Sequence, residues 1–167
     1  MQNEFCSSKQ PQDGFLTVTN TLYPDAPRVA VGAVVIHQNK VLLVLRGQPP
    51  AEGKWAIPGG SVKLGETLQA AAEREILEET GLRVKAGAVI YSFDTILRDE
   101  TGRVQYHYVI LDLKAEAIDP TQPLTSGDDA RDVGWFSLEE ALQLDTPVSE
   151  TTQALIRKII MEMNDGP

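Results

Sequence analysis

The chain has 167 residues, of which 42% are hydrophobic and 23% charged, and its formal net charge is −9. Such a composition predicts one soluble globular domain with a sizeable core, and the acidic balance excludes a broad basic surface for nucleic acid. No apolar run is long enough to span a membrane, and the N-terminus lacks the pattern of a secretory leader. Cys6 is the only cysteine, which excludes an intrachain disulfide and favours a reducing, cytoplasmic location.

The first part of the chain predicts a polar lead-in followed by a β-hairpin. Residues 1–27 form a polar N-terminal segment, and we expect residues 28–167 to form a single domain. Residues 28–36 (RVAVGAVVI) are nearly all apolar, as in a strand that is buried on both faces. A turn at residues 37–40 leads into a returning strand over 40–46, which Arg46 ends.

The next stretch predicts a short strand, a turn and a helix. Residues 54–58 extend toward Pro58, Gly59 and Gly60, where proline and glycine together predict a turn. Thr67 is the expected N-cap of a helix over 68–80, which is rich in strong helix formers. Gly81 supplies the left-handed residue that ends the helix.

Three carboxylates gather on one face of this predicted helix. Glu75, Glu78 and Glu79 stand at positions i, i+3 and i+4, where side chains are neighbours and like charges repel. Arg74 can reach Glu78, or Glu66 across the loop, but one arginine does not neutralise the whole cluster. A hard divalent cation with oxygen ligands does, so the helix predicts a site for Mg²⁺ or Mn²⁺.

The rest of the chain predicts more strands and two C-terminal helices. Strands are expected over 84–96 and 104–115, then a loop over 116–132 and a last strand over 133–136. In the second of these strands Tyr106, Tyr108 and Ile110 share one face and Gln105, His107 and Val109 share the other, so that one of the two faces could line a pocket with polar groups. Ser137 and Glu140 predict a capping box for a short helix to residue 144. A helix over about 149–163 has an apolar stripe to bury on the sheet or on a second subunit, which leaves monomer and homodimer open.

The glycine and carboxylate spacing resembles the signature of the Nudix (MutT-like) hydrolases. Gly60 is followed after five residues by Glu66, and after seven more by the run Arg74-Glu75-Ile76-Leu77-Glu78-Glu79-Thr80-Gly81-Leu82, so that the box covers 60–82. The resemblance implies an α/β/α sandwich with a mixed sheet, in agreement with the predicted elements. It also implies hydrolysis, with Mg²⁺ or Mn²⁺, of a nucleoside diphosphate linked to another moiety, a reaction in which clustered carboxylates and metals suit water attack on a phosphoanhydride.

Carried over position by position, the resemblance assigns roles to the acids of the box. It implies that Glu78 and Glu79 are metal ligands, joined by the backbone carbonyl of Gly60. Glu75 is implied as a ligand or as the general base, and these alternatives stay open. Arg74 and Glu66 are implied as an ion pair that supports the site.

Two regions outside the box are candidates for contact with the substrate. Family members often place a basic residue near Arg46 against the substrate, although a surface ion pair also explains it. They often recruit an acid from the loop before the last strand as a metal ligand or base, which here points to Asp128 and Asp129. A simple turn at residues 126–129 explains these aspartates equally well.

Residues 92–113 (SFDTILRDETGRVQYHYVILDL) resemble the ADP-ribose pyrophosphatase type among family members. Members of this type convert ADP-ribose to AMP and ribose 5-phosphate. The chain departs from that type where many ADP-ribose-specific members carry a proline, since Ile96 and Leu97 stand there. A (d)NTP pyrophosphatase of the MutT housecleaning type is therefore the alternative. A non-catalytic regulator that senses ADP-ribose is a third possibility, but such relatives usually have a degenerate box, and here the box is intact.

Overall fold

The computed structural model describes residues 22–127, 129–145 and 147–165. Cys6 and most of the polar N-terminal segment lie outside these ranges. The elements are, in chain order, β1 Arg28–His37, β2 Lys40–Arg46, β3 Trp55–Ala56, β4 Gly59–Ser61, α1 Leu68–Thr80, β5 Val84–Arg98, β6 Val104–Ala117, β7 Ala130–Ser137, α2 Leu138–Ala141 and α3 Glu150–Asn164. Each strand and helix expected from residue 28 onward is present, with ends that shift by a few residues.

The strands form one mixed sheet around β1. The main path runs β3-β2-β1-β6-β5, while β4 pairs with β1 and β7 pairs with β2. β1 lies parallel to β6 and antiparallel to β2 and β4. Because β1 has neighbours on both edges and helices over both faces, Val31, Val34 and Val35 are buried, as its uniformly apolar sequence predicts.

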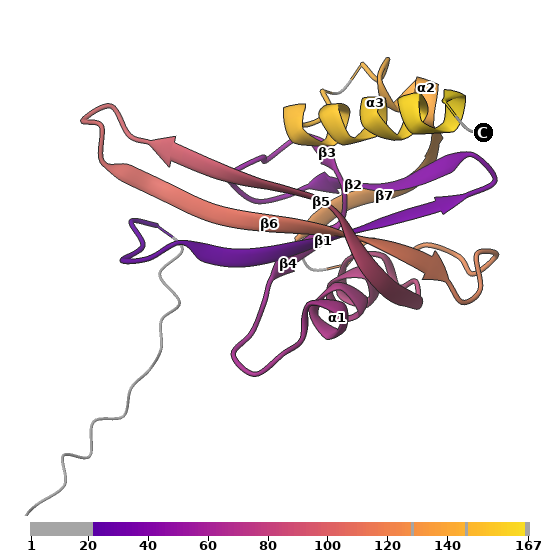
Figure 1. Ribbon diagram of the computed structural model, residues 1–167, viewed down its shortest axis with the longest axis horizontal. Helices are drawn as coiled ribbons and strands as arrows, with labels where there is room; N and C mark the ends of the chain where they lie inside the picture. The colour runs from indigo at the N-terminus through magenta and orange to yellow at the C-terminus, as the bar shows by residue number, and fades with distance from the viewer. Residues whose placement is uncertain (1–21, 128, 146, 166–167) are drawn as a thin grey trace, which may run out of the picture.

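The helices cover the sheet from opposite sides, which makes an α/β/α sandwich (Figure 1). On one side, Ala71, Ala72 and Ile76 of α1 pack on a cluster that includes Val31 and Val35. On the other, α2 and α3 bury a second cluster, which includes Val34, Leu43, Leu155, Ile156 and Ile159. The apolar stripe of α3 is thus buried on its own sheet, which is one of the two predicted alternatives. No helix in the described ranges combines the length and the apolar character that a membrane crossing needs.

The predicted helix ends are confirmed. The Thr67 side chain accepts a hydrogen bond from the Ala70 N–H at 3.1 Å, and Gly81 is left-handed with φ 71°. Ser137 and Glu140 form the reciprocal capping box at the start of α2. This helix ends at Ala141, so the expected extension to residue 144 is wrong.

The predicted glycine turn at residues 58–60 is also wrong. Gly59–Ser61 form the extended strand β4, which pairs antiparallel with β1. Glycine is needed there for close approach, because a Cβ on Gly59 would lie 2.1 Å from the carbonyl oxygen of Val31. The chain therefore presses onto β1 directly before the loop that leads to α1.

Candidate functional site

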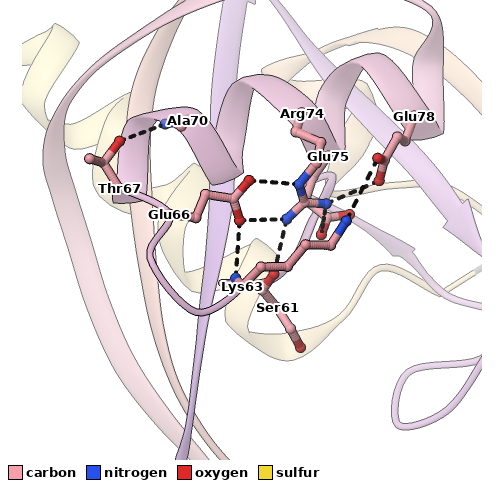
Figure 2. Close-up of polar contacts among 8 residues, drawn as sticks. All are labelled: Ser61, Lys63, Glu66, Thr67, Ala70, Arg74, Glu75 and Glu78. Atoms are coloured by element: carbon pink, nitrogen blue, oxygen red, sulfur yellow. Dashed lines mark hydrogen bonds and ion pairs between the residues drawn. The ribbon is translucent and has the colours of Figure 1, made fainter. Parts of the chain in front are cut away.

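Arg74 lies at the centre of a polar network between the loop before α1 and the helix itself (Figure 2). Its Nε and Nη2 donate to the two carboxylate oxygens of Glu66 at 2.7 and 2.9 Å, and Nη2 also donates to the carbonyl of Ser61 at 3.1 Å. Its Nη1 donates to Glu75 at 2.7 Å and to Glu78 at 3.0 Å. The predicted contacts with Glu66 and Glu78 both exist, and the bond to Glu75 adds a third.

The contact between Arg74 and Glu66 fixes the charge of both partners. The bidentate contact with Arg74, helped by the Lys63 N–H, lowers the pKa of Glu66 to about 2. The same contact raises the pKa of Arg74, so the guanidinium and the Glu66 carboxylate are both charged at neutral pH. Arg74 thereby ties the loop to the helix through charged hydrogen bonds and holds two further carboxylates of the helix in place.

Glu79 is in a different environment from the other two acids of the cluster. Only 6% of its surface is exposed, and its carboxylate accepts a hydrogen bond from the Gly59 N–H at 2.9 Å. Burial raises the pKa of Glu79 to about 7, against the opposing effects of the Gly59 N–H and of Arg46. The sequence predicts that the three acids share a face, but it does not predict that one of them is buried under β4.

Gly60 leaves room for the Glu75 carboxylate. A Cβ at residue 60 would lie 2.5–2.6 Å from the carboxyl atoms of Glu75, inside van der Waals contact. The side chain of Glu75 therefore rests against the bare backbone of β4, next to the bond between Glu79 and Gly59. Acids from two turns of α1 and the backbone of two glycines thus meet at one edge of the sheet.

A cavity of about 440 Å³ opens beside this edge, on the α3 side of the sheet. Its floor comes from β1, β5 and β6, with Phe93, Tyr108 and Ile110 among the lining residues. Gly59 and Gly60 border it, as do Arg46 and Lys54, two cationic residues from the region of β2 and β3. Alternation along β6 leaves open which of its faces lines a pocket, and the structure shows that it is the face of Tyr108 and Ile110.

Comparison with known proteins connects this site to a family. The model of the NUDIX domain matches residues 26–158. The chain belongs to the NUDIX family. It is 37% identical over 118 residues to a protein of Methanocaldococcus jannaschii named ADP-ribose pyrophosphatase, a match that covers 71% of this chain and 66%, just under two thirds, of that relative. It is 36% identical over 119 residues to the phosphatase NudJ of Escherichia coli K12, which covers 70% of this chain and 72% of NudJ.

Solved structures agree with this assignment. The crystal structure of a MutT NUDIX hydrolase from Burkholderia pseudomallei superposes with a TM-score of 0.67 at 27% identity, over 80% of this chain and 98% of that one. A NUDIX hydrolase from Nitrosomonas europaea gives a TM-score of 0.66 at 26% identity, over 84% of this chain and 73% of that one. The protein is therefore a Nudix hydrolase, and the predicted sandwich is the fold of its family.

Nudix hydrolases are generally dependent on divalent metals, and the donors at this site fit such an ion. Among the described residues, no three acidic, histidine or cysteine side chains converge tightly enough to hold a metal as they stand. The reason is that Arg74 holds Glu75 and Glu78, while the Gly59 N–H holds Glu79. The donor chemistry nevertheless suits Mg²⁺, because the carboxylate oxygens of α1 and the backbone carbonyls of β4 are hard ligands that rotamer changes could turn toward one ion.

Two of the substrate candidates outside the Nudix box, Arg46 and Asp129, lie at the paired ends of β2 and β7. Arg46 lines the cavity and lies close enough to Glu79 to lower its pKa. Asp129 is exposed, but its charge raises the pKa of Glu79, and its backbone carbonyl accepts from the Gly47 N–H at 2.7 Å. Asp128 lies outside the described residues. Arg46 and Asp129 are thus both close enough to act on the buried Glu79 carboxyl, with opposite effects on its pKa.

Sequence reasoning missed Asp112, a carboxyl that lines the cavity from β6. Only 4% of its surface is exposed, and in the described part of the chain its side chain has no hydrogen-bond partner. Burial raises the pKa of Asp112 to about 6. Asp112 continues the alternation of Tyr108 and Ile110 along β6, but alternation does not tell which face of this strand meets the pocket.

Asp112→Asn is expected to stabilise the ligand-free protein at pH 8. Because its folded pKa of about 6 exceeds the ordinary 3.8, the folded state binds the extra proton between those values, and stability falls as the pH rises through them. The difference between the two pKa values corresponds to at most about 3 kcal/mol of unfolding free energy, and water in the cavity lowers this limit. We therefore expect the substitution to raise the free energy of unfolding by about 2 kcal/mol at pH 8 and by almost nothing below pH 4. Denaturant unfolding of both proteins at the two pH values measures this.

Asp119→Asn is the matched control for that experiment. Hydrogen bonds from Thr121 lower the pKa of Asp119, so the same substitution there should reduce stability above the ordinary pKa. If Asp112→Asn instead lowers stability at pH 8, then the carboxylate has a stabilising partner in the free protein.

Proposed function

We propose that this Nudix hydrolase uses Mg²⁺ or Mn²⁺ to cleave the phosphoanhydride of a nucleoside diphosphate linked to a second moiety, with ADP-ribose as the first candidate and AMP and ribose 5-phosphate as products. The observation that carries the proposal is the adjacency of the acid cluster on α1 to a cavity with both cationic and aromatic lining. The 37% identity to a relative named ADP-ribose pyrophosphatase supports the substrate.

The box residues would hold the metal at the edge of the cavity. Glu78 and Glu79 are the proposed ligands, with the Gly60 carbonyl, and Glu75 is either a further ligand or the general base. A divalent ion bound there neutralises phosphate charge and lowers the pKa of a water. Glu66 and Arg74 position the acids from outside the reaction, through the loop-to-helix contact.

The other walls of the cavity suit the remaining parts of such a substrate. The guanidinium of Arg46 and the ammonium of Lys54 border the cavity near Gly59, where they can bind phosphate oxygens. Phe93 and Tyr108 offer aromatic surface on which a nucleobase can stack. Asp129, near Glu79, is a second candidate for the base that accepts a proton from water.

A (d)NTP pyrophosphatase of the MutT type is the second candidate function. The likeness to a MutT NUDIX hydrolase in fold and in sequence favours it, and the same acids would act on a triphosphate. An ADP-ribose-sensing regulator without activity has no such support. The two enzymatic candidates differ in whether the anhydride links two nucleotide-like halves or ends in a free phosphate.

Hydrolysis of ADP-ribose is expected to stop when divalent metal is removed. Treatment with a chelator should lower the rate to background, and added Mg²⁺ or Mn²⁺ should restore it, because the acids then regain the cation that offsets their charge and that of the substrate. The measurement is release of the corresponding nucleoside monophosphate, run in parallel over ADP-ribose, NADH, nucleotide sugars, dinucleoside polyphosphates and nucleoside triphosphates. Turnover that persists in the chelator contradicts the mechanism, and preference for triphosphates selects the second candidate.

A further inference from the structure

Asp112 and Gly59 belong to one row of paired residues that crosses the sheet from strand to strand. Gly32 of β1 pairs with Gly59 of β4 on one side and with Asp112 of β6 on the other. Neighbouring strands are separated by about 4.7–4.9 Å, so the backbones of Gly59 and Asp112 lie about 10 Å apart. This row of paired residues therefore connects Gly59, whose N–H binds Glu79, with Asp112.

The side chain of Asp112 leans along this row toward the box. A Cβ on Gly32 would lie only 2.1 Å from the Oδ1 of Asp112, so the carboxyl occupies the space that a side chain at residue 32 would fill. It is therefore directed over β1, toward Gly59, within the cavity that both residues line. Any larger residue at position 32 would displace it.

Nothing in the described part of the chain satisfies this carboxyl. It makes no hydrogen bond or ion pair there, and burial raises its pKa. Its oxygens open into the cavity, since no fully buried side-chain nitrogen or oxygen of the described residues lacks a partner. In the row its neighbours are Gly32 on β1 and Tyr91 on β5, and the Ile57 side chain lies on the same side of Gly32, 3.1 Å from where a Cβ would stand. A buried carboxyl without a partner is unfavourable, which makes donors from a ligand the expected compensation.

The position of the Asp112 carboxyl indicates which hydrogen-bond donors of a ligand can reach it. A phosphate bound at the Gly59 edge carries its 5′-linked ribose as the next group, and the ribose hydroxyls lie one furanose ring away. A nucleobase lies further along, where Phe93 and Tyr108 provide the aromatic surface. A carboxylate has two acceptor oxygens, which match the two adjacent hydroxyls of a ribose.

We propose that Asp112 is a specificity residue that accepts hydrogen bonds from the 2′- and 3′-hydroxyls of a substrate ribose next to the cleaved phosphoanhydride. This inference rests on the proposed function and deepens it. It makes the site selective for ribonucleotide-type substrates over 2′-deoxy analogues, because an analogue that lacks a hydroxyl leaves a buried acceptor unpaired. ADP-ribose has such a ribose on each side of its anhydride.

The test measures the affinities of two ligands, which differ in one hydroxyl, for two proteins, which differ in one residue. AMP and 2′-deoxy-AMP are titrated by calorimetry, in the presence of Mg²⁺, into wild type and into Asp112→Asn. Wild type should bind AMP at least about 10-fold more tightly than 2′-deoxy-AMP, the range expected for a hydrogen bond to a charged group. In Asp112→Asn the preference should fall below about 3-fold, through weaker binding of AMP alone.

Asp94→Asn is the matched control, since it makes the same change at an exposed position of β5 and should retain the wild-type preference. A preference for AMP that survives in Asp112→Asn overturns the inference, as does a wild type that binds the two ligands equally or binds neither. Equal weakening of both ligands would mean that the carboxyl contacts the base. Because these ligands are not turned over, failure to hydrolyse ADP-ribose would overturn the proposed substrate separately.

Discussion

Glu79→Gln is expected to lower kcat at least 100-fold while the protein remains folded. The amide has almost the size of the carboxyl, and its oxygen can still accept from the Gly59 N–H, so packing under β4 should persist. The substitution removes the negative charge that the site needs, either to bind a metal ion or to take up a proton, and losses of 10²–10⁴ are typical for such groups. Steady-state hydrolysis of the preferred substrate, with thermal unfolding of the same sample, measures both effects.

Glu73→Gln on the same helix separates a site effect from a helix effect. The Glu73 carboxylate accepts from the Ala86 N–H at 3.0 Å and pairs with Lys85, away from the network around Arg74. The kcat of the Glu73→Gln variant should stay within a few-fold of the wild-type value. Near-normal turnover in Glu79→Gln would remove Glu79 from the reaction and leave Glu75 and Glu78 to be tested in its place.

The fold could be predicted from the sequence because its elements carry strong local signals. Thr67 and Gly81 mark the two ends of α1, and both caps are present as expected. The uniformly apolar run of β1 predicts a strand covered on both faces, and helices cover both. The spacing of the acids in α1 predicts the contacts of Arg74, since residues four apart on a helix are neighbours.

Features that depend on contacts distant in sequence could not be predicted in this way. Gly59 and Gly60 were interpreted as a turn because both residues permit one, whereas their role in β4 follows from how closely the chain approaches β1. Burial of Glu79 requires β4 to lie over α1, and local spacing contains no information on that. Alternation along β6 puts Asp112 on the face of Tyr108 and Ile110, but it does not tell which face meets the cavity. That depends on partners distant in sequence, such as Gly32, in a strand that pairs with β6 from about 80 residues earlier.

The carboxyl groups of the site differ in whether the protein itself supplies a cationic partner for them. Glu66, Glu75 and Glu78 share one guanidinium, which pairs with each of them but does not neutralise all three. Glu79 and Asp112 are not paired with it, and burial raises the pKa of each. A metal ion and a sugar are the two kinds of ligand that would satisfy them, which is why affinity for a metal–substrate complex should exceed what either part alone provides.

Arg74→Ala is expected to weaken both the fold and the reaction. It removes the bidentate contact with Glu66, the bond to the Ser61 carbonyl and the cation shared by Glu75 and Glu78. Several charge-assisted bonds are lost together, so we expect the melting temperature to fall by about 5–10 °C. The acids also lose their fixed positions, and kcat/KM should fall by about 10–100-fold.

Mg²⁺ and a lysine variant distinguish the two roles of the guanidinium. In Arg74→Ala, added Mg²⁺ should recover part of the lost melting temperature, more than it stabilises wild type, because the freed carboxylates can then bind the ion. Arg74→Lys keeps the charge but not the planar fork, so it should lose the loop-to-helix contact and retain part of the compensation at Glu75 and Glu78. If Arg74→Ala changes neither melting temperature nor rate, the network in Figure 2 supports nothing that the reaction needs, and the acids of α1 are held in place by other contacts.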